Sequence, residues 1–312
     1  MPKKIDEQPT ELPGASSEEL TEPSSRNVDG CSGSSLKHSH LQLRETIPEA
    51  SMTSFIGDDF YRMDKKRRGY AVIFNNETFE TLSPREGSRK DVIALEETFG
   101  PDCLGFDVEC HNDLSADDIG NELQKLSKAD HSECDCLCVI FLTHGMDNGI
   151  IHLKKGVYLV DQLWAPFLND KCLGLAGKPK FFFIQACRGT KAHYGVNLVR
   201  FNSSEMDSVS RESYIIPSHS DILVSYSTVP GALSPRNKIK GTWFIQSLCK
   251  VLKEHYKTSD LLSMLTMVNR EVALGYEFCG DESQESADRY CGMKVTPIFT
   301  STLMRNVFFL PK

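Results

Sequence analysis

The strongest constraint on the fold is an alternation of short, continuously apolar segments with segments of helical periodicity. Runs such as Phe181–Ile184 have no polar face, which is typical of strands buried on both sides of a parallel sheet. The pattern predicts an α/β fold with a mostly parallel central sheet of about six strands, covered by helices on both faces. The expected strands span residues 69–76, 105–110, 134–145, 178–187, 220–228 and 297–309, and the expected helices span 88–100, 114–131, 241–256 and 259–278.

Three small residues mark expected helix ends. Ser88 and Ser115 each precede an amphipathic segment and are expected to be N-caps, because a serine hydroxyl can accept a hydrogen bond from a free N–H of the first turn. Gly100 follows the first helical pattern and is expected to end that helix.

The chain divides into a polar arm and one folded domain. Residues 1–58 are rich in Ser, Glu, Pro and Thr and poor in aromatic residues, so we expect a short disordered segment. Residues 59–312 are expected to form a single domain. Within it, 191–216 and 280–290 lack periodicity and are expected to be an exposed linker and an acidic loop, of the kind that is often functional or cleavable.

The charge and the cysteine content limit the possible partners and compartments. A net charge of −8 argues against a general binder of nucleic acid or of anionic membranes. The basic run 65–68 is expected to be a solvated segment rather than a targeting signal. No apolar run reaches membrane-spanning length and the N-terminal residues are polar, so we expect no secretory signal. Eleven cysteines without such a signal indicate free thiols and a cytoplasmic location.

One group of cysteines raises the question of a metal site. Cys134, Cys136 and Cys138 alternate along an expected strand, so all three point to one face. Zinc sites usually use a C-x₂-C spacing instead, which favours core packing over metal binding. We expect neither a metal nor a cofactor.

Reactive side chains follow two of the expected strands. His144 and Gly145 end one strand, and Cys187 ends another. If these strands are parallel neighbours, both ends meet at the edge where ligands bind in open α/β sheets. A thiolate beside an imidazole is a nucleophile with its proton partner, and the backbone N–H groups of Gly145 and Cys187 could stabilise an oxyanion.

The run QACRG at residues 185–189 resembles the sequence around the nucleophile of caspases. The segments RRGYAVIFNN, IFLTHG, GKPKFFFIQACRGT, SYSTVPG and RNKIKGTWFIQSL are similar to those of effector caspases in order and spacing. The resemblance covers roughly residues 60–310. It implies a caspase-like fold and a cysteine endopeptidase that cleaves proteins after aspartate in apoptosis, with Cys187 as nucleophile and His144 as its partner.

The resemblance also implies a pocket for the substrate aspartate. Its matching residues are Arg85, Gln185 and Arg236. Two guanidinium groups fit a carboxylate in a way that a lysine does not, and they are poorly satisfied without an anion. Further matching residues in the substrate groove are Ser234, Asn237, Trp243 and Tyr290.

Two residues depart from the family pattern. Leu233 and Pro235 stand where effector caspases carry aromatic residues that line the second substrate pocket, so the preference at that position stays open. Asn237 and Trp243 match residues of the fourth pocket, which indicates an acidic preference there.

The resemblance implies activation by cleavage and assembly into a dimer. Asp207 lies in the expected linker and Asp29 in the polar arm, and each is followed by a small residue. Cleavage at Asp207 would yield a large subunit, 59–207, and a small subunit, 208–312. The last strand is expected at a sheet edge, where a second copy could pair. An upstream activating caspase and inhibitor proteins are further implied partners.

Three alternatives differ in class. The first is a catalytically silent homologue that regulates a partner protease, against which the intact Cys187 and His144 argue. The second is a related peptidase with basic specificity, which would need acidic residues in place of Arg85 and Arg236. The third is a nucleotide-binding α/β protein, but no glycine-rich phosphate loop follows the first strand.

Overall fold

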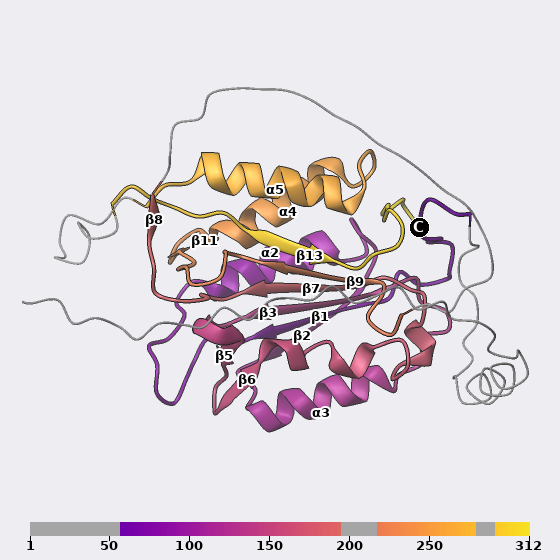
Figure 1. The fold of residues 1–312 in the computed structure, drawn as a ribbon, viewed down its shortest axis with the longest axis horizontal. Helices are drawn as coiled ribbons and strands as arrows, with labels where there is room; N and C mark the ends of the chain where they lie inside the picture. Colours follow the sequence, from indigo (N-terminus) through magenta and orange to yellow (C-terminus); the bar gives the residue numbers. More distant parts are fainter. Residues whose placement is uncertain (1–56, 195–216, 279–290) are drawn as a thin grey trace, which may run out of the picture. The chain divides into compact units, whose positions relative to one another are not determined.

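The computed structural model describes residues 57–194, 217–278 and 291–312, which are built around a six-stranded sheet (Figure 1). Its strand order is β13-β9-β7-β3-β1-β2. The strands are β1 (Tyr70–Asn75), β2 (Asp107–Asn112), β3 (Leu137–Leu142), β7 (Lys180–Gln185), β9 (Ile222–Tyr226) and β13 (Ile298–Ser301). The first five are parallel to their neighbours, and β13 runs antiparallel to β9 at one edge. The predicted fold class is confirmed.

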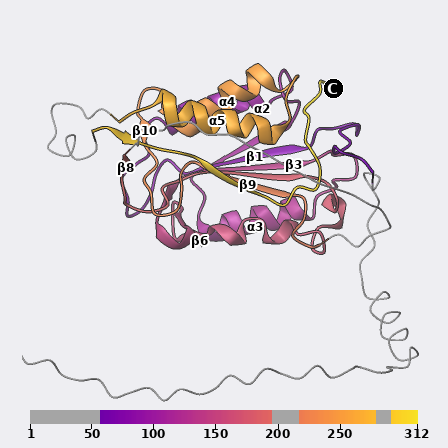
Figure 2. The same ribbon diagram turned by 45° about the horizontal axis from the view of Figure 1, so that its top comes forward.

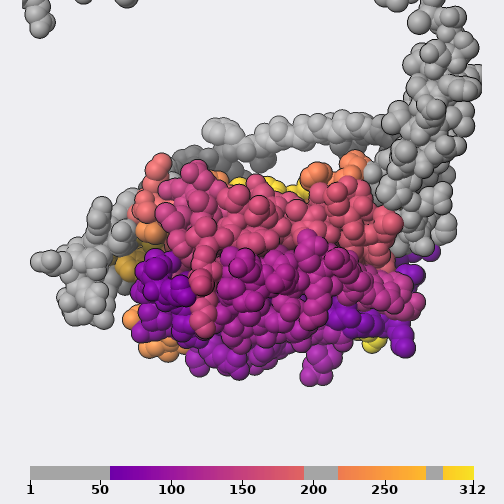
Figure 3. All heavy atoms as spheres, turned by 90° about the horizontal axis from the view of Figure 1, so that it is seen from below, coloured from indigo at the N-terminus to yellow at the C-terminus, as the bar shows by residue number. Residues whose placement is uncertain are grey.

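Helices cover both faces of this sheet, as Figures 1 and 2 show. One face carries α2 (Ser88–Phe99), α4 (Trp243–His255) and α5 (Leu261–Gly275). The other face carries α3 (Ala116–Ser127), together with the short 3₁₀ helices η2 (Val160–Gln162), η3 (Ala165–Phe167) and η4 (Leu173–Leu175). Seen from the α3 side, most of the described surface has the indigo to rose colours of residues before 195 (Figure 3).

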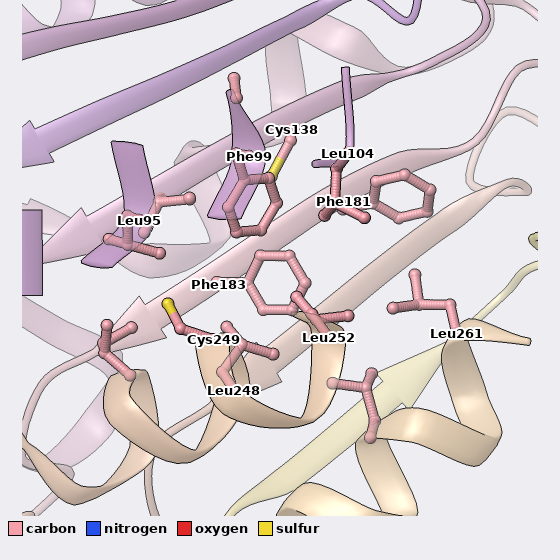
Figure 4. Close-up of a cluster of buried hydrophobic side chains, with 14 of the residues drawn as sticks. Leu95, Phe99, Leu104, Cys138, Phe181, Phe183, Leu248, Cys249, Leu252 and Leu261 are labelled. Carbon is pink, nitrogen blue, oxygen red and sulfur yellow. The ribbon is translucent and has the colours of Figure 1, made fainter. Parts of the chain in front are cut away.

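The four central strands are mostly apolar because alternate side chains enter two separate cores. In β7, Phe181 and Phe183 face α2, α4 and α5, whereas Phe182 and Ile184 face α3. Figure 4 shows Phe183 packed among Phe99, Leu248 and Leu252 in the first core. Cys136 and Cys138 belong to the same core and Cys134 is also buried, which confirms the packing role predicted for them. The predicted alternation along one strand was wrong, because β3 begins at Leu137 and contains Cys138 alone.

The helix ends confirm one predicted cap and correct another. Ser115 caps α3 in a capping box, in which its hydroxyl accepts from the Asp118 N–H and the Asp118 carboxylate accepts from the Ser115 N–H. Ser88, by contrast, is the first helical residue of α2, and Gly87 precedes it with a left-handed φ of 88°. The N-cap prediction for Ser88 was wrong because the turn needs a backbone conformation that glycine adopts easily.

Several short elements were not predicted. Residues 144–159 form a small sheet of β4 (His144–Gly145), β5 (Ile150–His152) and β6 (Val157–Leu159), with η1 (Asp147–Gly149) between the first two. The strand predicted to run to Gly145 therefore ends at Leu142. Two further pairs are β10 (Arg236–Asn237) with β11 (Gly241–Thr242), and β8 (His193–Tyr194) with β12 (Met293–Lys294).

Two other expectations need correction. The last strand, expected over 297–309, is limited to Ile298–Ser301, although it does lie at the sheet edge. The basic run is not wholly solvated, because Arg68 is 1% exposed and its guanidinium contacts buried Asp135 at 3.3 Å. Burial of this cation is possible because a carboxylate and a backbone carbonyl, that of Leu104, accept its N–H groups.

None of the helices in the described part of the chain combines the length and the apolarity that crossing a bilayer requires.

Candidate active site

The sheet brings the two reactive strand ends together. β3 and β7 are parallel neighbours, and Leu142 pairs with Gln185 at their carboxyl ends. The Thr143 N–H extends this pairing by donating to the Gln185 carbonyl at 3.0 Å. His144 and Cys187 each lie two residues beyond the last pair, so they emerge at the same edge. The predicted juxtaposition of the imidazole and thiol segments is therefore present.

His144 is oriented by a loop that sequence reasoning did not identify. Its Nε2 lies 3.0 Å from the Ser83 carbonyl oxygen, and its ring packs against Phe79 with centroids 4.8 Å apart. With Nε2 used as the donor to Ser83, Nδ1 is the nitrogen free to accept a proton. Residues 77–84 have no periodic pattern, so no sequence signal pointed to this support.

The environment of His144 favours its neutral form. Burial lowers the pKa of His144, and the positive charges of Arg85 and Arg236 lower it further, while the hydrogen bond to the Ser83 carbonyl acts in the opposite direction. A neutral imidazole is the form that can accept a proton from a thiol.

The Cys187 side chain lies against the backbone of the segment that precedes β10. Its Sγ lies 3.3 Å from the Ser234 N and 3.8 Å from the Ser234 carbonyl oxygen. Among the residues that the structure describes, the sulfur has no hydrogen bond to His144.

Gly145 lies directly against the segment that contains Cys187. A Cβ added at Gly145 would be 2.2 Å from the Cys187 carbonyl oxygen and 3.0 Å from the Ala186 Cβ. Only glycine permits this approach, which keeps the Gly145 backbone next to that of Cys187.

Arg85 is a buried cation on the loop before α2. It is 1% exposed, one of its terminal nitrogens donates to the Asn76 carbonyl at 3.3 Å, and its Nε has no partner among the described residues. Burial lowers the pKa of Arg85 to about 9, and the charge of Arg236 contributes in the same direction. Two guanidinium groups that repel each other, of which that of Arg85 is fully buried, indicate a site for an anion.

Arg236 and Gln185 are the other members of this site. We call the three residues Arg85, Gln185 and Arg236 the crevice. The Arg236 Nε donates to the Glu86 carbonyl at 2.9 Å, and burial lowers the pKa of Arg236. Charge on Cys187 raises the pKa of both arginines, so the sulfur lies within electrostatic reach of the pair. The Gln185 amide nitrogen donates to the Ser234 hydroxyl at 2.8 Å, and its oxygen is buried without a partner in the described residues.

The remaining predicted site residues are partly described. The Asn237 carboxamide oxygen accepts from the Ile239 and Lys240 N–H groups and so holds the β10–β11 turn. Trp243 begins α4 and stacks on Tyr276 with centroids 5.3 Å apart. Pro235 lies just before β10, outside the ladder, where no N–H is required of it. Tyr290, Asp29 and Asp207 lie outside the described residues.

Comparisons with known proteins agree with this geometry. The family model of the caspase domain matches residues 68–308. Caspase-1 of Spodoptera frugiperda is 40% identical over 252 residues, which cover 80% of this chain and 81% of that protein. Caspase-7 of Gallus gallus is 38% identical over 253 residues, covering 80% and 79%. The crystal structure of the Spodoptera caspase-1 superposes with a TM-score of 0.76 at 38% identity, covering 85% of this chain and 98% of the other.

The chain therefore belongs to the caspase family. It is a cysteine-type endopeptidase that cleaves its protein substrates after aspartate.

Proposed function

We propose that this caspase is an effector-type zymogen of the cytoplasm that acts in apoptosis, and that His144, Cys187, Arg85, Gln185 and Arg236 are its working residues. The observation that carries the assignment is the presence of two guanidinium groups within electrostatic reach of the Cys187 sulfur, where Arg85 is fully buried and its Nε lacks a partner in the described residues. A carboxylate that enters this crevice supplies the missing acceptor and relieves the repulsion between the arginines.

The chemistry follows from that arrangement. The substrate aspartate binds the two arginines and Gln185, which holds its carbonyl carbon near Sγ. His144 takes the thiol proton, the thiolate attacks the carbonyl carbon, and the Gly145 and Cys187 N–H groups donate to the oxyanion. Collapse of this intermediate breaks the peptide C–N bond, and His144 returns the proton to the leaving amine. Water then attacks the acyl-enzyme while His144 removes its proton, which releases the acid and the thiol.

Specificity for aspartate follows from the distance between the crevice and the sulfur. A glutamate side chain is one methylene longer, so binding of its carboxylate to the arginines would displace the carbonyl carbon from Sγ. We expect kcat/KM for a peptide with glutamate at the cleavage position to be at least about 100-fold lower than for aspartate. Trp243 and Asn237 support an acidic preference at the fourth position.

The test is hydrolysis of an aspartyl peptide by the wild-type protein and by Cys187→Ala. We expect activity in the wild type and none in the variant, with Cys249→Ala as a control for a buried cysteine in the core between the sheet and α4. A wild-type protein that binds a partner protease but cleaves no aspartyl peptide after processing would instead be the silent regulator.

Activation is proposed to occur by cleavage after Asp207 in the linker and after Asp29 in the arm. A large subunit, 59–207, and a small subunit, 208–312, would result, with an upstream caspase as the first activator and inhibitor proteins as further partners. Asp207→Ala is expected to leave a single chain under conditions that split the wild type, as judged by denaturing electrophoresis. Two fragments of unchanged size from this variant would reject Asp207 as the processing site.

A further inference from the structure

The two arginines of the crevice belong to segments that are far apart in the sequence but joined by direct contacts. The Arg236 Nε donates to the Glu86 carbonyl, and the Lys238 ammonium pairs with the Glu86 carboxylate at 2.7 Å. Gly87 lies so close to the β10–β11 turn that an added Cβ would be 2.5 Å from the Lys238 carbonyl oxygen. The spacing of Arg85 and Arg236 therefore depends on how α2 and this hairpin are held together.

Asp91, in the first turn of α2, makes a buried connection between the same two segments. Its carboxylate oxygen Oδ1 accepts from the Thr242 N–H at 2.9 Å and from the Gln246 side-chain amide at 2.8 Å. Thr242 is the direct cross-strand partner of Arg236 in the β10–β11 hairpin. Asp91 is fully buried, and its other oxygen, Oδ2, has no partner among the described residues.

No side chain separates Asp91 from the hairpin. Gly241 has a φ of 94°, and a Cβ added there would lie 2.4 Å from Oδ1 of Asp91. The carboxylate thus sits against bare backbone, with both of its bonds donated by neutral groups. A buried carboxylate in such a place needs an additional source of stabilisation.

Burial raises the pKa of Asp91, and the hydrogen bonds from Gln246 and Thr242 oppose this rise, as does the positive charge of Arg85. The charge of Asp91 raises the pKa of both Arg85 and Arg236, and for Arg236 it is the largest effect of any neighbouring charge. The crevice therefore combines two cations with one internal anion before a substrate binds. When the substrate carboxylate binds, it adds a second anion to the same group of charges.

We propose that Asp91 is a positioning residue that holds the hairpin of Arg236 against the helix that follows Arg85, and that it is the internal counter-ion of the two arginines before a substrate binds. This inference rests on the proposed roles of Arg85 and Arg236. It follows that Asp91 competes electrostatically with the substrate carboxylate. Asp91 makes the pair of arginines tolerable before binding, and it limits how strongly they favour a charged ligand over a neutral one.

The experiment compares two peptide aldehydes that differ at the terminal residue, one ending in aspartate and one in the neutral isostere asparagine. Asp91→Asn keeps the shape and the oxygen that accepts from Thr242 and Gln246, but removes the charge. We expect the ratio of the two inhibition constants to shift in favour of the aspartyl ligand by about tenfold, because one opposing charge is lost near the site. We also expect the ligand-free variant to melt at a lower temperature.

A second variant protects the test against a failure of Asp91→Asn to fold. Gln246 is partly exposed, and in Gln246→Lys an ammonium group replaces the amide that contacts Asp91. Pairing with this lysine neutralises Asp91 without altering it, so the ratio should shift in the same direction. Asp260→Asn is the matched control, because Asp260 caps α5 by accepting from two backbone N–H groups away from the crevice.

The outcomes separate this inference from the proposed function. A wild-type enzyme that does not distinguish the two aldehydes rejects the roles of Arg85 and Arg236 themselves. If the wild type does distinguish them, weakening of both ligands by the same factor in Asp91→Asn and Gln246→Lys reduces Asp91 to a structural residue. An unchanged ratio in both variants likewise overturns the counter-ion role.

Discussion

At the scale of single residues, the crevice is defined by the positive charges of Arg85 and Arg236, which lie close together and repel each other. Arg85 is buried, and its Nε has no partner among the described residues. The positive charge of Arg236 lies close enough to lower the pKa of Arg85. The charges of the two arginines also lower the pKa of His144 and so disfavour its imidazolium form. Binding of an anion near the arginines should therefore also change the pKa of the His144 imidazole.

This coupling predicts a pH dependence with a definite sign. Burial and the two arginines hold the pKa of His144 below its ordinary value of 6.5 in the free enzyme. The acidic limb of kcat/KM, which reports the free enzyme, should therefore have a midpoint below pH 6.5. A bound aspartate neutralises the arginines, so the acidic limb of kcat should lie at higher pH.

The measurement is steady-state hydrolysis of an aspartyl peptide from about pH 5 to about pH 8. His255→Gln serves as the control, because His255 ends α4 at an exposed position and should leave both midpoints unchanged. Coincident midpoints for kcat and kcat/KM would contradict the coupling between the arginines and His144.

At the scale of elements, α3 stabilises the domain but contributes no residue to the candidate active site. It packs through Ile119 and Leu123 onto the face of the sheet opposite α2 and α4. The Ser115–Asp118 capping box provides hydrogen-bond acceptors for two backbone N–H groups at the start of the helix. Stability and activity can therefore be separated at this helix.

We expect Ser115→Ala to lower the free energy of unfolding by about 1 kcal/mol, because the Asp118 N–H loses its acceptor. The kcat/KM for an aspartyl peptide should not change. Urea denaturation followed by circular dichroism measures the first quantity. Ser127→Ala, at the partly exposed C-terminal end of the same helix, should change it by less than about 0.5 kcal/mol. Equal losses in the two variants would show that the cap contributes nothing specific.

At the scale of the whole molecule, buried polar contacts join parts of the chain that processing would separate. Asp221, just before β9, accepts from the Tyr61 hydroxyl at 2.7 Å and from the Asn169 amide at 3.2 Å. Asn169 in turn accepts from the fully buried Lys180 ammonium at 2.8 Å. A cut between residues 207 and 208 would leave this network intact, so the two proposed subunits should stay associated.

The free edge of β13 predicts the assembly of the processed enzyme. β13 pairs with β9 on one side, and in the sheet that the structure describes its other side has no strand. We expect the processed protein to be a dimer joined at this edge, and Thr300→Lys to shift it toward monomer because a charged side chain on an edge strand opposes pairing. Sedimentation velocity gives the mass of each species. Thr258→Lys adds the same charge at an exposed turn and should remain dimeric. A wild-type processed enzyme that sediments as a monomer would refute the edge assembly.

Much of this protein was determined by its sequence alone. The central strands could be predicted because both of their faces are buried, so that runs such as Phe181–Ile184 are continuously apolar. The Ser115 cap could be predicted because its partners lie within one turn. The meeting of His144 and Cys187 required only that β3 and β7 be parallel neighbours, which the apolar strands made a reasonable inference.

Only the tertiary structure decided which distant groups support the site. The Ser83 carbonyl, the Phe79 ring and the Asp91 carboxylate carry no local signal, because their partners lie 61, 65 and 151 residues away in the sequence. The burial of Arg68 likewise depends on Asp135, which is adjacent only after the chain has folded. Local patterns record whether a segment is buried, whereas the identity of its neighbours is set by the order and register of the strands.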